Sequence, residues 1–131
     1  MVNDQISDMI IRIKNSAMVG KKTADIPYSK MKFEIAKILK KVGFIEGFVK
    51  KGKGVERLIE ILLKYNEDGS SKITDLKRVS TPGRRVYSLA KNLKSVRQGV
   101  GMSIISTPKG LMNNSEAKRN NLGGEILFVI W

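Results

Sequence analysis

The chain has 131 residues and lacks both cysteine and histidine. These absences exclude disulfides, zinc sites built on thiolates or imidazoles, cysteine nucleophiles and Ser-His-Asp catalytic triads. Its 25 Lys and Arg residues outnumber its 12 Asp and Glu residues, giving a net charge of +13. Cations that neutralise phosphates release condensed counterions, so nucleic acid is the expected partner.

A membrane surface is the alternative partner for so much positive charge. A membrane-spanning helix needs about 20 apolar residues, whereas the longest apolar run, Ile126 to Trp131, has six. Asp4 and Asp8 stand where a secretory signal would have a basic start and an apolar stretch. We therefore expect a cytoplasmic protein without a membrane partner.

The N-terminal half predicts two amphipathic helices. Asn3 or Asp4 can cap the first helix, and Gly20 follows its end. Ser29 can cap the second helix, and Gly43 closes it. Both apolar stripes recur at helical spacing: Ile6, Met9, Ile10, Ile13 and Ala17 in the first helix, and Met31, Ile35, Ile38, Leu39 and Val42 in the second.

A β-hairpin is predicted after the second helix. Its strands are residues 44–50 and 57–65, and the connection Lys51-Gly52-Lys53-Gly54 is rich in glycine. Residues 26–28 can add a short strand between the helices. The polar stretch 66–71 has the composition of a linker or an exposed turn, so we predict two domains, residues 1–66 and 67–131.

The C-terminal half predicts several short strands. They lie near residues 72–79, 85–87 and 101–106, with a turn at 81–83 and a short helix around 114–120. Residues 126–131 are apolar at every position, which is typical of a strand covered on both faces in the middle of a sheet. The expected fold class is α+β with two small subdomains: an N-terminal α-β-α-β-β unit and a C-terminal unit that is mainly β with short helices.

One loop has the residues to bind RNA. An apolar strand runs directly into Ser106-Thr107-Pro108-Lys109-Gly110. The two hydroxyls can donate to and accept from base edges and ribose 2′-OH groups, and Lys109 can contact a phosphate. Pro108 favours an extended backbone at Thr107, and Gly110 permits close approach. The same residue types are common in turns, so a purely structural turn is the alternative.

Two further segments are candidates for RNA contact. Gly123-Gly124-Glu125 could bring backbone close to a ligand and offer a carboxylate to a base amino group or to a neighbouring loop; a glycine bulge is the alternative. Arg85 and Tyr87 place a guanidinium beside an aromatic ring, although Tyr87 could belong to the core. With only 6% aromatic residues, the chain lacks repeated stacking platforms, which favours structured RNA over an unstructured strand.

No signal for catalysis is found in the sequence. Gly52-Lys53-Gly54 and Gly99-Val100-Gly101 both lack the third glycine of a dinucleotide loop, and no phosphate-binding Gly-Lys-Ser/Thr loop follows a strand. The carboxylates are scattered along the chain. We therefore expect no enzyme activity, cofactor, metal or small-molecule substrate.

Three stretches of the chain carry its most specific motifs. They are Asp8-Met9 through Arg12-Ile13-Lys14-Asn15; Ser29-Lys30-Met31-Lys32 through Ile35-Ala36 to Gly43-Phe44-Ile45; and Ile105-Ser106-Thr107-Pro108-Lys109-Gly110 with Gly123-Gly124-Glu125. Together these stretches resemble the ribosomal protein S-eight family of the bacterial or organellar small subunit. The resemblance spans the whole chain, and the Ser106 and Gly124 motifs are highly specific in combination.

This resemblance implies a structural constituent of the small ribosomal subunit that catalyses no reaction. Family members bind a helix in the central domain of the small-subunit rRNA early in assembly, and neighbouring ribosomal proteins dock nearby. The expected location is the ribosome, in the cytoplasm or in an organellar stroma or matrix. Some members also bind the mRNA of their own operon, which this sequence leaves open. A free RNA-binding regulator or RNA chaperone is the alternative function.

The resemblance also implies which residues contact RNA. The main surface would be C-terminal, and the N-terminal domain would add phosphate contacts. Ile11 stands where the family often has Thr, which removes one hydroxyl from the first helix. The implied C-terminal residues are Ser106, Thr107, Pro108, Lys109, Gly110, Gly123, Gly124, Glu125, Arg85 and Tyr87, and the implied N-terminal residues are Arg12, Lys14, Asn15, Lys30 and Lys32.

Overall fold

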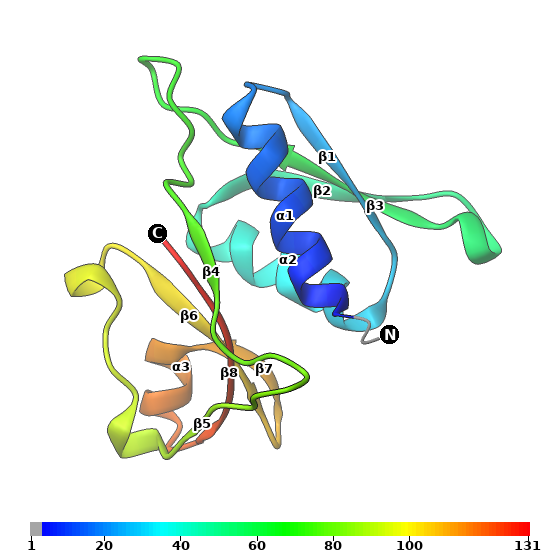
Figure 1. The fold of residues 1–131 in the computed structure, drawn as a ribbon. Coiled ribbons are helices and arrows are strands. Elements are labelled where there is room, and N and C mark those ends of the chain that lie inside the picture. Colours follow the sequence, from blue (N-terminus) through cyan, green and yellow to red (C-terminus); the bar gives the residue numbers. More distant parts are fainter. Residues whose placement is uncertain (1–3) are drawn as a thin grey trace. The chain divides into compact units, whose positions relative to one another are not determined.

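Residues 4–131 are described by a computed structural model of the chain (Figure 1). Asn3, one of the two expected helix caps, lies outside the described residues. The chain forms two compact units: Asp8–Thr74, and Asp75–Trp131 together with residues 4–7. Helices and antiparallel sheets are both present, which confirms the α+β class. Across residues 4–131, no helix is long and apolar enough to cross a membrane.

The change from one unit to the other lies at residues 74–75, whereas the sequence places it after residue 66. The polar segment between these points is an exposed turn. Asn66 N donates to Ser70 O over 2.8 Å, and Tyr65 and Ser71 form an isolated β-bridge. The turn closes on itself because Asp68 accepts hydrogen bonds from both the backbone N and the hydroxyl of Ser70.

The N-terminal elements follow the predicted α-β-α-β-β order. The sheet has the strand order β1-β3-β2, with both pairs antiparallel. Buried and partly buried residues alternate along β3, so one face of the sheet belongs to the core. The apolar stripes of the helices are buried as well. The elements are α1 (Gln5–Met18), β1 (Thr23–Pro27), α2 (Lys30–Val42), β2 (Ile45–Lys51), the 3₁₀ turn η1 (Gly54–Glu56) and β3 (Leu58–Leu63).

Capping determines where both long helices begin, as the sequence predicts. Asp4 Oδ1 accepts from Ser7 N over 3.1 Å at the start of α1. Ser29 Oγ accepts from Lys32 N over 3.1 Å at the start of α2. At the end of α2, Gly43 adopts φ 99°, a left-handed conformation that suits glycine.

The buried stripe of α2 differs from the predicted one. Met31 is 44% and Val42 45% exposed, whereas Lys32 and Ala36 are buried beside Ile35 and Leu39. Residues 32, 35, 36 and 39 share one face at the i, i+3, i+4, i+7 spacing. The long aliphatic stem of Lys32 can cover apolar surface, which lets lysine occupy a position that the sequence pattern assigns to the solvent.

The C-terminal unit is built around its last strand, as predicted. β8 lies between β4 and β6 in the sheet order β4-β8-β6-β7, and β5 also pairs with β8. β7 is not predicted by the sequence, because Gly110 and Asn113 give this short strand the composition of a loop. The elements are β4 (Leu76–Arg78), β5 (Tyr87–Ser88), the 3₁₀ turns η2 (Ala90–Asn92) and η3 (Arg97–Gly99), β6 (Met102–Thr107), β7 (Gly110–Asn113), α3 (Asn114–Arg119) and β8 (Gly124–Ile130).

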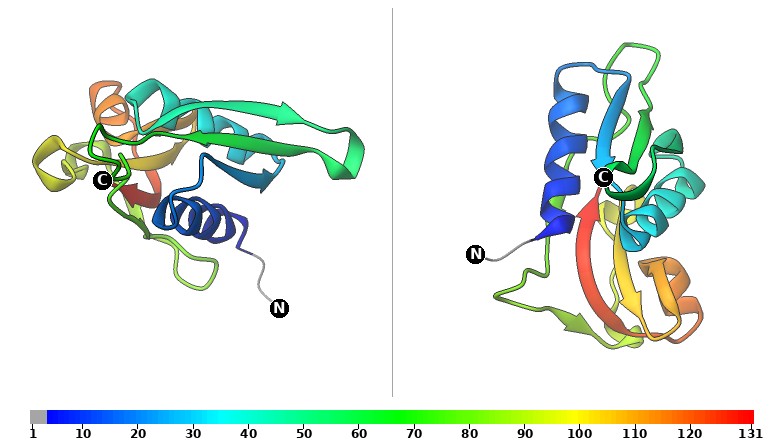
Figure 2. Two further views of the ribbon diagram at one scale, coloured as in Figure 1. Left: turned by 90° about the horizontal axis from the view of Figure 1, so that it is seen from above. Right: turned by 90° about the vertical axis from the view of Figure 1, so that its right-hand side faces the viewer.

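The short helix α3 lies beside β6 and β7 (Figure 2). Asn113 caps it by accepting from Glu116 N over 2.8 Å. Ala117 of α3 packs in a buried cluster with Leu93, Ile105 and Met112. This cluster fixes Leu93, directly after η2, against the sheet.

Candidate nucleic-acid interface

Residues far apart in the sequence meet at one end of the C-terminal sheet. Tyr87 of β5 pairs with Glu125 of β8, and Glu125 pairs on its other side with Ser106 of β6. Ser106 in turn pairs with Leu111 of β7. The strand register therefore places the Ser106 loop, the Gly123-Gly124-Glu125 segment and the Tyr87 segment side by side.

These segments border an open groove of about 690 Å³. Tyr87 is 69% and Leu89 62% exposed, so an aromatic ring and an aliphatic side chain stand at its rim. Tyr87 is thus not a core residue. The groove, called the sheet-end groove below, is lined by Tyr87, Ser88, Leu89, Ser106, Thr107, Pro108, Gly123, Gly124 and Glu125.

The two glycines are required by close backbone packing. A Cβ on Gly124 would lie 2.0 Å from Ser106 O, and a Cβ on Gly123 would lie 2.4 Å from Ser88 O. Atoms that are not bonded to each other do not approach so closely in a folded chain. The absence of side chains therefore lets β8 approach both β6 and the segment after β5, and so creates the floor of the groove.

The loop after β6 is held by a threonine hydroxyl. Thr107 is buried; its Oγ1 donates to Gly110 O over 2.7 Å and accepts from Lys109 N over 3.2 Å. Gly110 adopts φ 113°, which disfavours other residues. Pro108 and Lys109 are exposed at the tip. The hydroxyl of Thr107 thus shapes the loop.

Ser106 differs from Thr107 in what its hydroxyl does. Within residues 4–131, the Ser106 hydroxyl makes no hydrogen bond, although the residue lines the sheet-end groove. A hydroxyl can donate one hydrogen bond and accept two. Ser106 is therefore the side chain of this loop that is best prepared to bind a polar ligand group.

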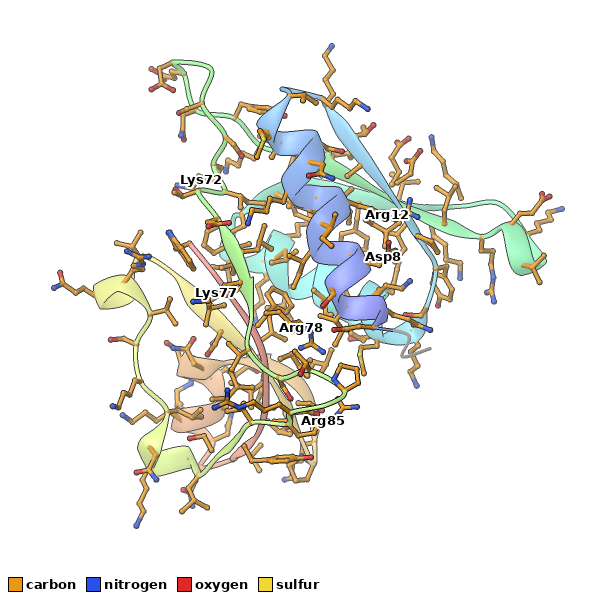
Figure 3. All side chains as sticks on the ribbon, viewed as in Figure 1. Asp8, Arg12, Lys72, Lys77, Arg78 and Arg85 are labelled. Atoms are coloured by element: carbon orange, nitrogen blue, oxygen red, sulfur yellow. The ribbon has the colours of Figure 1, made fainter. Side chains whose placement is uncertain are left out.

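Glu125 is held by protein groups. Its Oε2 accepts from the hydroxyl of Ser80, which is fully buried, and from Arg85 Nη1 over 3.0 Å (Figure 3 labels Arg85). Burial acts to raise the pKa of Glu125, but the hydrogen bonds from Ser80 and Arg85 and the positive charge of Arg85 outweigh it and lower this pKa. The carboxylate is ionised at neutral pH.

Ser80, which donates to this carboxylate, also holds the segment that carries Arg85 and Tyr87. Ser80 Oγ accepts from Val86 N over 3.1 Å, and Ile126 N donates to Val86 O over 2.9 Å. Sequence reasoning missed Ser80, Ser88 and Leu89. Serine and leucine are too common to signal a site, and only the strand pairing brings them to it.

The implied N-terminal contacts lie in the other unit. Arg12 donates to Asp8 over 2.9 Å (both are labelled in Figure 3) and to Asp25 O over 3.3 Å. Asn15 and Lys30 are exposed, and Lys14 is partly buried. Lys32 is only 4% exposed, and its pKa is lowered by burial and by nearby Arg12, against the opposite effect of Asp8.

Aromatic residues of the N-terminal unit do not form open stacking platforms. Phe33 contacts Tyr28 and Phe48, with ring centroids 5.9 and 5.1 Å apart. Basic side chains cover these rings: Lys50 and Arg57 lie over Tyr28, Lys37 over Phe33 and Lys40 over Phe48. Across the described residues, no three Asp or Glu side chains gather into a group that could hold a metal ion.

Comparison with known proteins identifies the family. The family model for ribosomal protein S8 matches residues 4–131. The chain is 49% identical over 130 residues to small ribosomal subunit protein uS8 of Rippkaea orientalis, covering 98% of each chain. It is 45% identical over 130 residues to the protein of the same name from Rubrobacter xylanophilus, covering 99% of this chain and 98% of the relative. The chain therefore belongs to the ribosomal protein S8 family.

Proposed function

We propose that this chain is a structural constituent of the small ribosomal subunit that binds rRNA through the sheet-end groove. The register that brings Tyr87, Glu125 and Ser106 into one row carries this proposal. It joins the motifs that resemble the family to a single surface in a protein of net charge +13. The expected ligand is a helix of the central domain of the small-subunit rRNA, bound as a primary step of assembly.

The groove offers different groups to different parts of an RNA. The Ser106 hydroxyl can donate to and accept from a base edge or a ribose 2′-OH, and the exposed ring of Tyr87 can stack on a base or a ribose. Lys109 and Arg85 can contact phosphates. Phosphate contacts supply affinity, whereas contacts to base edges supply specificity, so we assign discrimination between RNAs mainly to Ser106.

The other implied residues have supporting roles in this proposal. Thr107, Gly110, Gly123, Gly124 and Glu125 build the groove, and Pro108 presents an apolar edge at its rim. Arg12, Lys14, Asn15 and Lys30 add phosphate contacts from the N-terminal unit. The role is structural rather than catalytic, with neighbouring small-subunit proteins as further partners inside the ribosome. An operon mRNA that imitates the rRNA site would occupy the same groove.

Filter binding to a central-domain rRNA fragment and to a structured RNA of equal length tests this proposal. We expect the native chain to prefer the rRNA fragment and Ser106→Ala to reduce that preference about tenfold, the size of one specific hydrogen-bonded contact. The salt dependence should stay nearly unchanged, because no phosphate contact is lost. Ser115→Ala is the matched control, since Ser115 is exposed on α3 and lines no part of the groove. Equal affinity of the native chain for both RNAs would contradict the proposal.

A further inference from the structure

A second hollow lies in the same unit as the sheet-end groove. The two are close along the chain: Leu89, directly before η2, lines the groove, and Lys91 of η2 lines the hollow. The hollow has a volume of about 730 Å³. We call it the lysine hollow; its lining residues are Lys91, Asn92, Leu93, Lys94, Ser95 and Lys118.

The backbone around the lysine hollow is held by α3. Lys118 Nζ donates to Leu93 O over 3.3 Å, and Asn114 Nδ2 donates to Lys94 O over 3.0 Å. The Asn114 side chain is fixed in turn, because its Oδ1 accepts from Ser103 N of β6 over 3.2 Å. Leu93 is 4% exposed and belongs to the buried cluster. The hollow is thus a defined part of the unit.

The chemistry of the lining suits an anion. Three ammonium groups border the hollow, and no carboxylate does. Across the described residues, neither Lys91 nor Lys94 forms an ion pair. Lysine ammonium groups bind phosphate oxygens as point charges. Asn92 and Ser95 can add hydrogen bonds to its oxygens.

We propose that the lysine hollow binds phosphodiester groups of the same RNA whose helix occupies the sheet-end groove. The inference rests on the proposed function, because Lys91 follows Leu89 of that groove by two residues, and this closeness is what favours RNA over an acidic protein. A strand that leaves the groove past Leu89 would reach Lys91 next. Such contacts orient the RNA and add affinity without reading its sequence.

The double variant Lys91→Gln/Lys94→Gln tests the inference, because it removes two charges and keeps the backbone contacts. We expect affinity for the rRNA fragment to fall about tenfold, the size of two surface charge contacts. The slope of log K against log salt should become smaller by about 1.5. The preference for rRNA over the matched RNA should be unchanged.

The matched control is Lys72→Gln/Lys77→Gln, which removes the same charge. Both lysines are labelled in Figure 3, are exposed, and line neither the groove nor the hollow. This control should leave the salt slope nearly unchanged. Equal slopes for the two double variants would overturn the inference. A native chain that shows no preference for rRNA would contradict the proposed function, and the slope comparison would still decide the role of the hollow.

Lysine acylation read by mass spectrometry supplies a second readout that does not depend on affinity. In the complex with the rRNA fragment, Lys91 and Lys94 should be protected, while Lys77 should react as in the free protein. Protection that appears only in the assembled subunit, and not in the binary complex, would overturn the RNA assignment and make the hollow a protein-binding surface.

Discussion

The buried hydroxyl of Ser80 donates a hydrogen bond to Glu125, the residue at which β5, β8 and β6 lie side by side. Through this pair, and through the bond from Val86 N to Ser80 Oγ, the segment with Arg85 and Tyr87 is tied to β8. The shape of the sheet-end groove therefore depends on a serine that does not line it.

Removing this hydroxyl should destabilise the C-terminal unit. Ser80→Ala leaves Val86 N without its acceptor and Glu125 without one donor, which costs about 1–3 kcal/mol of unfolding free energy. Urea denaturation followed by the fluorescence of Trp131, the only tryptophan, measures it. Ser95→Ala is the control and should change stability by less than about 0.5 kcal/mol, since Ser95 is exposed. Equal stability of the two variants would show that the pair contributes nothing.

The stability of this unit should also depend on pH through Glu125. Because the pKa of Glu125 is lower in the folded chain than its ordinary value of 4.5, its ionised form stabilises the fold fully above about pH 4.5. This contribution is lost as pH falls through the lower folded pKa. Urea denaturation followed by Trp131 fluorescence at several pH values between 3 and 7 measures this effect. As pH falls, Glu125→Gln should lose less unfolding free energy than the native chain. Parallel curves for the two proteins would assign the loss to other carboxylates.

Gly124 should tolerate no side chain. In Gly124→Ala the added Cβ would meet Ser106 O at 2.0 Å, so β6 and β8 must separate. We expect a loss of about 3 kcal/mol of unfolding free energy, near the upper end of the range for overpacking, and weaker preference for the rRNA fragment. Gly83→Ala is the control, because Gly83 has open space around its Cα and a φ that other residues adopt. A stable Gly124→Ala variant with unchanged RNA preference would contradict this account of the groove.

The family resemblance and the structure suggest different roles for Lys32. The resemblance implies a phosphate contact, whereas the side chain is 4% exposed and its pKa is lowered by burial. Lys32→Met should therefore raise the stability of α2 by about 1 kcal/mol, because the partly desolvated ammonium is replaced by an apolar chain of similar length. Hydrogen exchange of the α2 amides measures this gain.

RNA binding by the same variant gives the complementary result. Lys32→Met should leave affinity and salt slope unchanged, whereas Lys30→Met, at an exposed neighbour, should lower both. A smaller salt slope for Lys32→Met would support the phosphate contact that the resemblance implies.

Much of the local structure could be predicted because it depends on residues close in sequence. The caps at Asp4 and Ser29 and the glycine at the end of α2 determine the helix limits, and the hairpin follows from its glycine-rich connection. The burial of Lys32 and the exposure of Met31 could not be predicted. Periodicity identifies an apolar face, but packing against other elements selects its rotation.

The sequence by itself determined the absence of cysteine and histidine chemistry, the excess of positive charge, and the apolar last strand that lies in the middle of the sheet. It also contained the motifs around Ser106 and Gly124 as separate segments. Only the tertiary structure decided that they share one groove, that the Thr107 hydroxyl holds the loop while Ser106 faces the groove, and that Ser80 holds Glu125. The reason is physical: antiparallel pairing connects residues by register across strands, and register depends on the whole sheet.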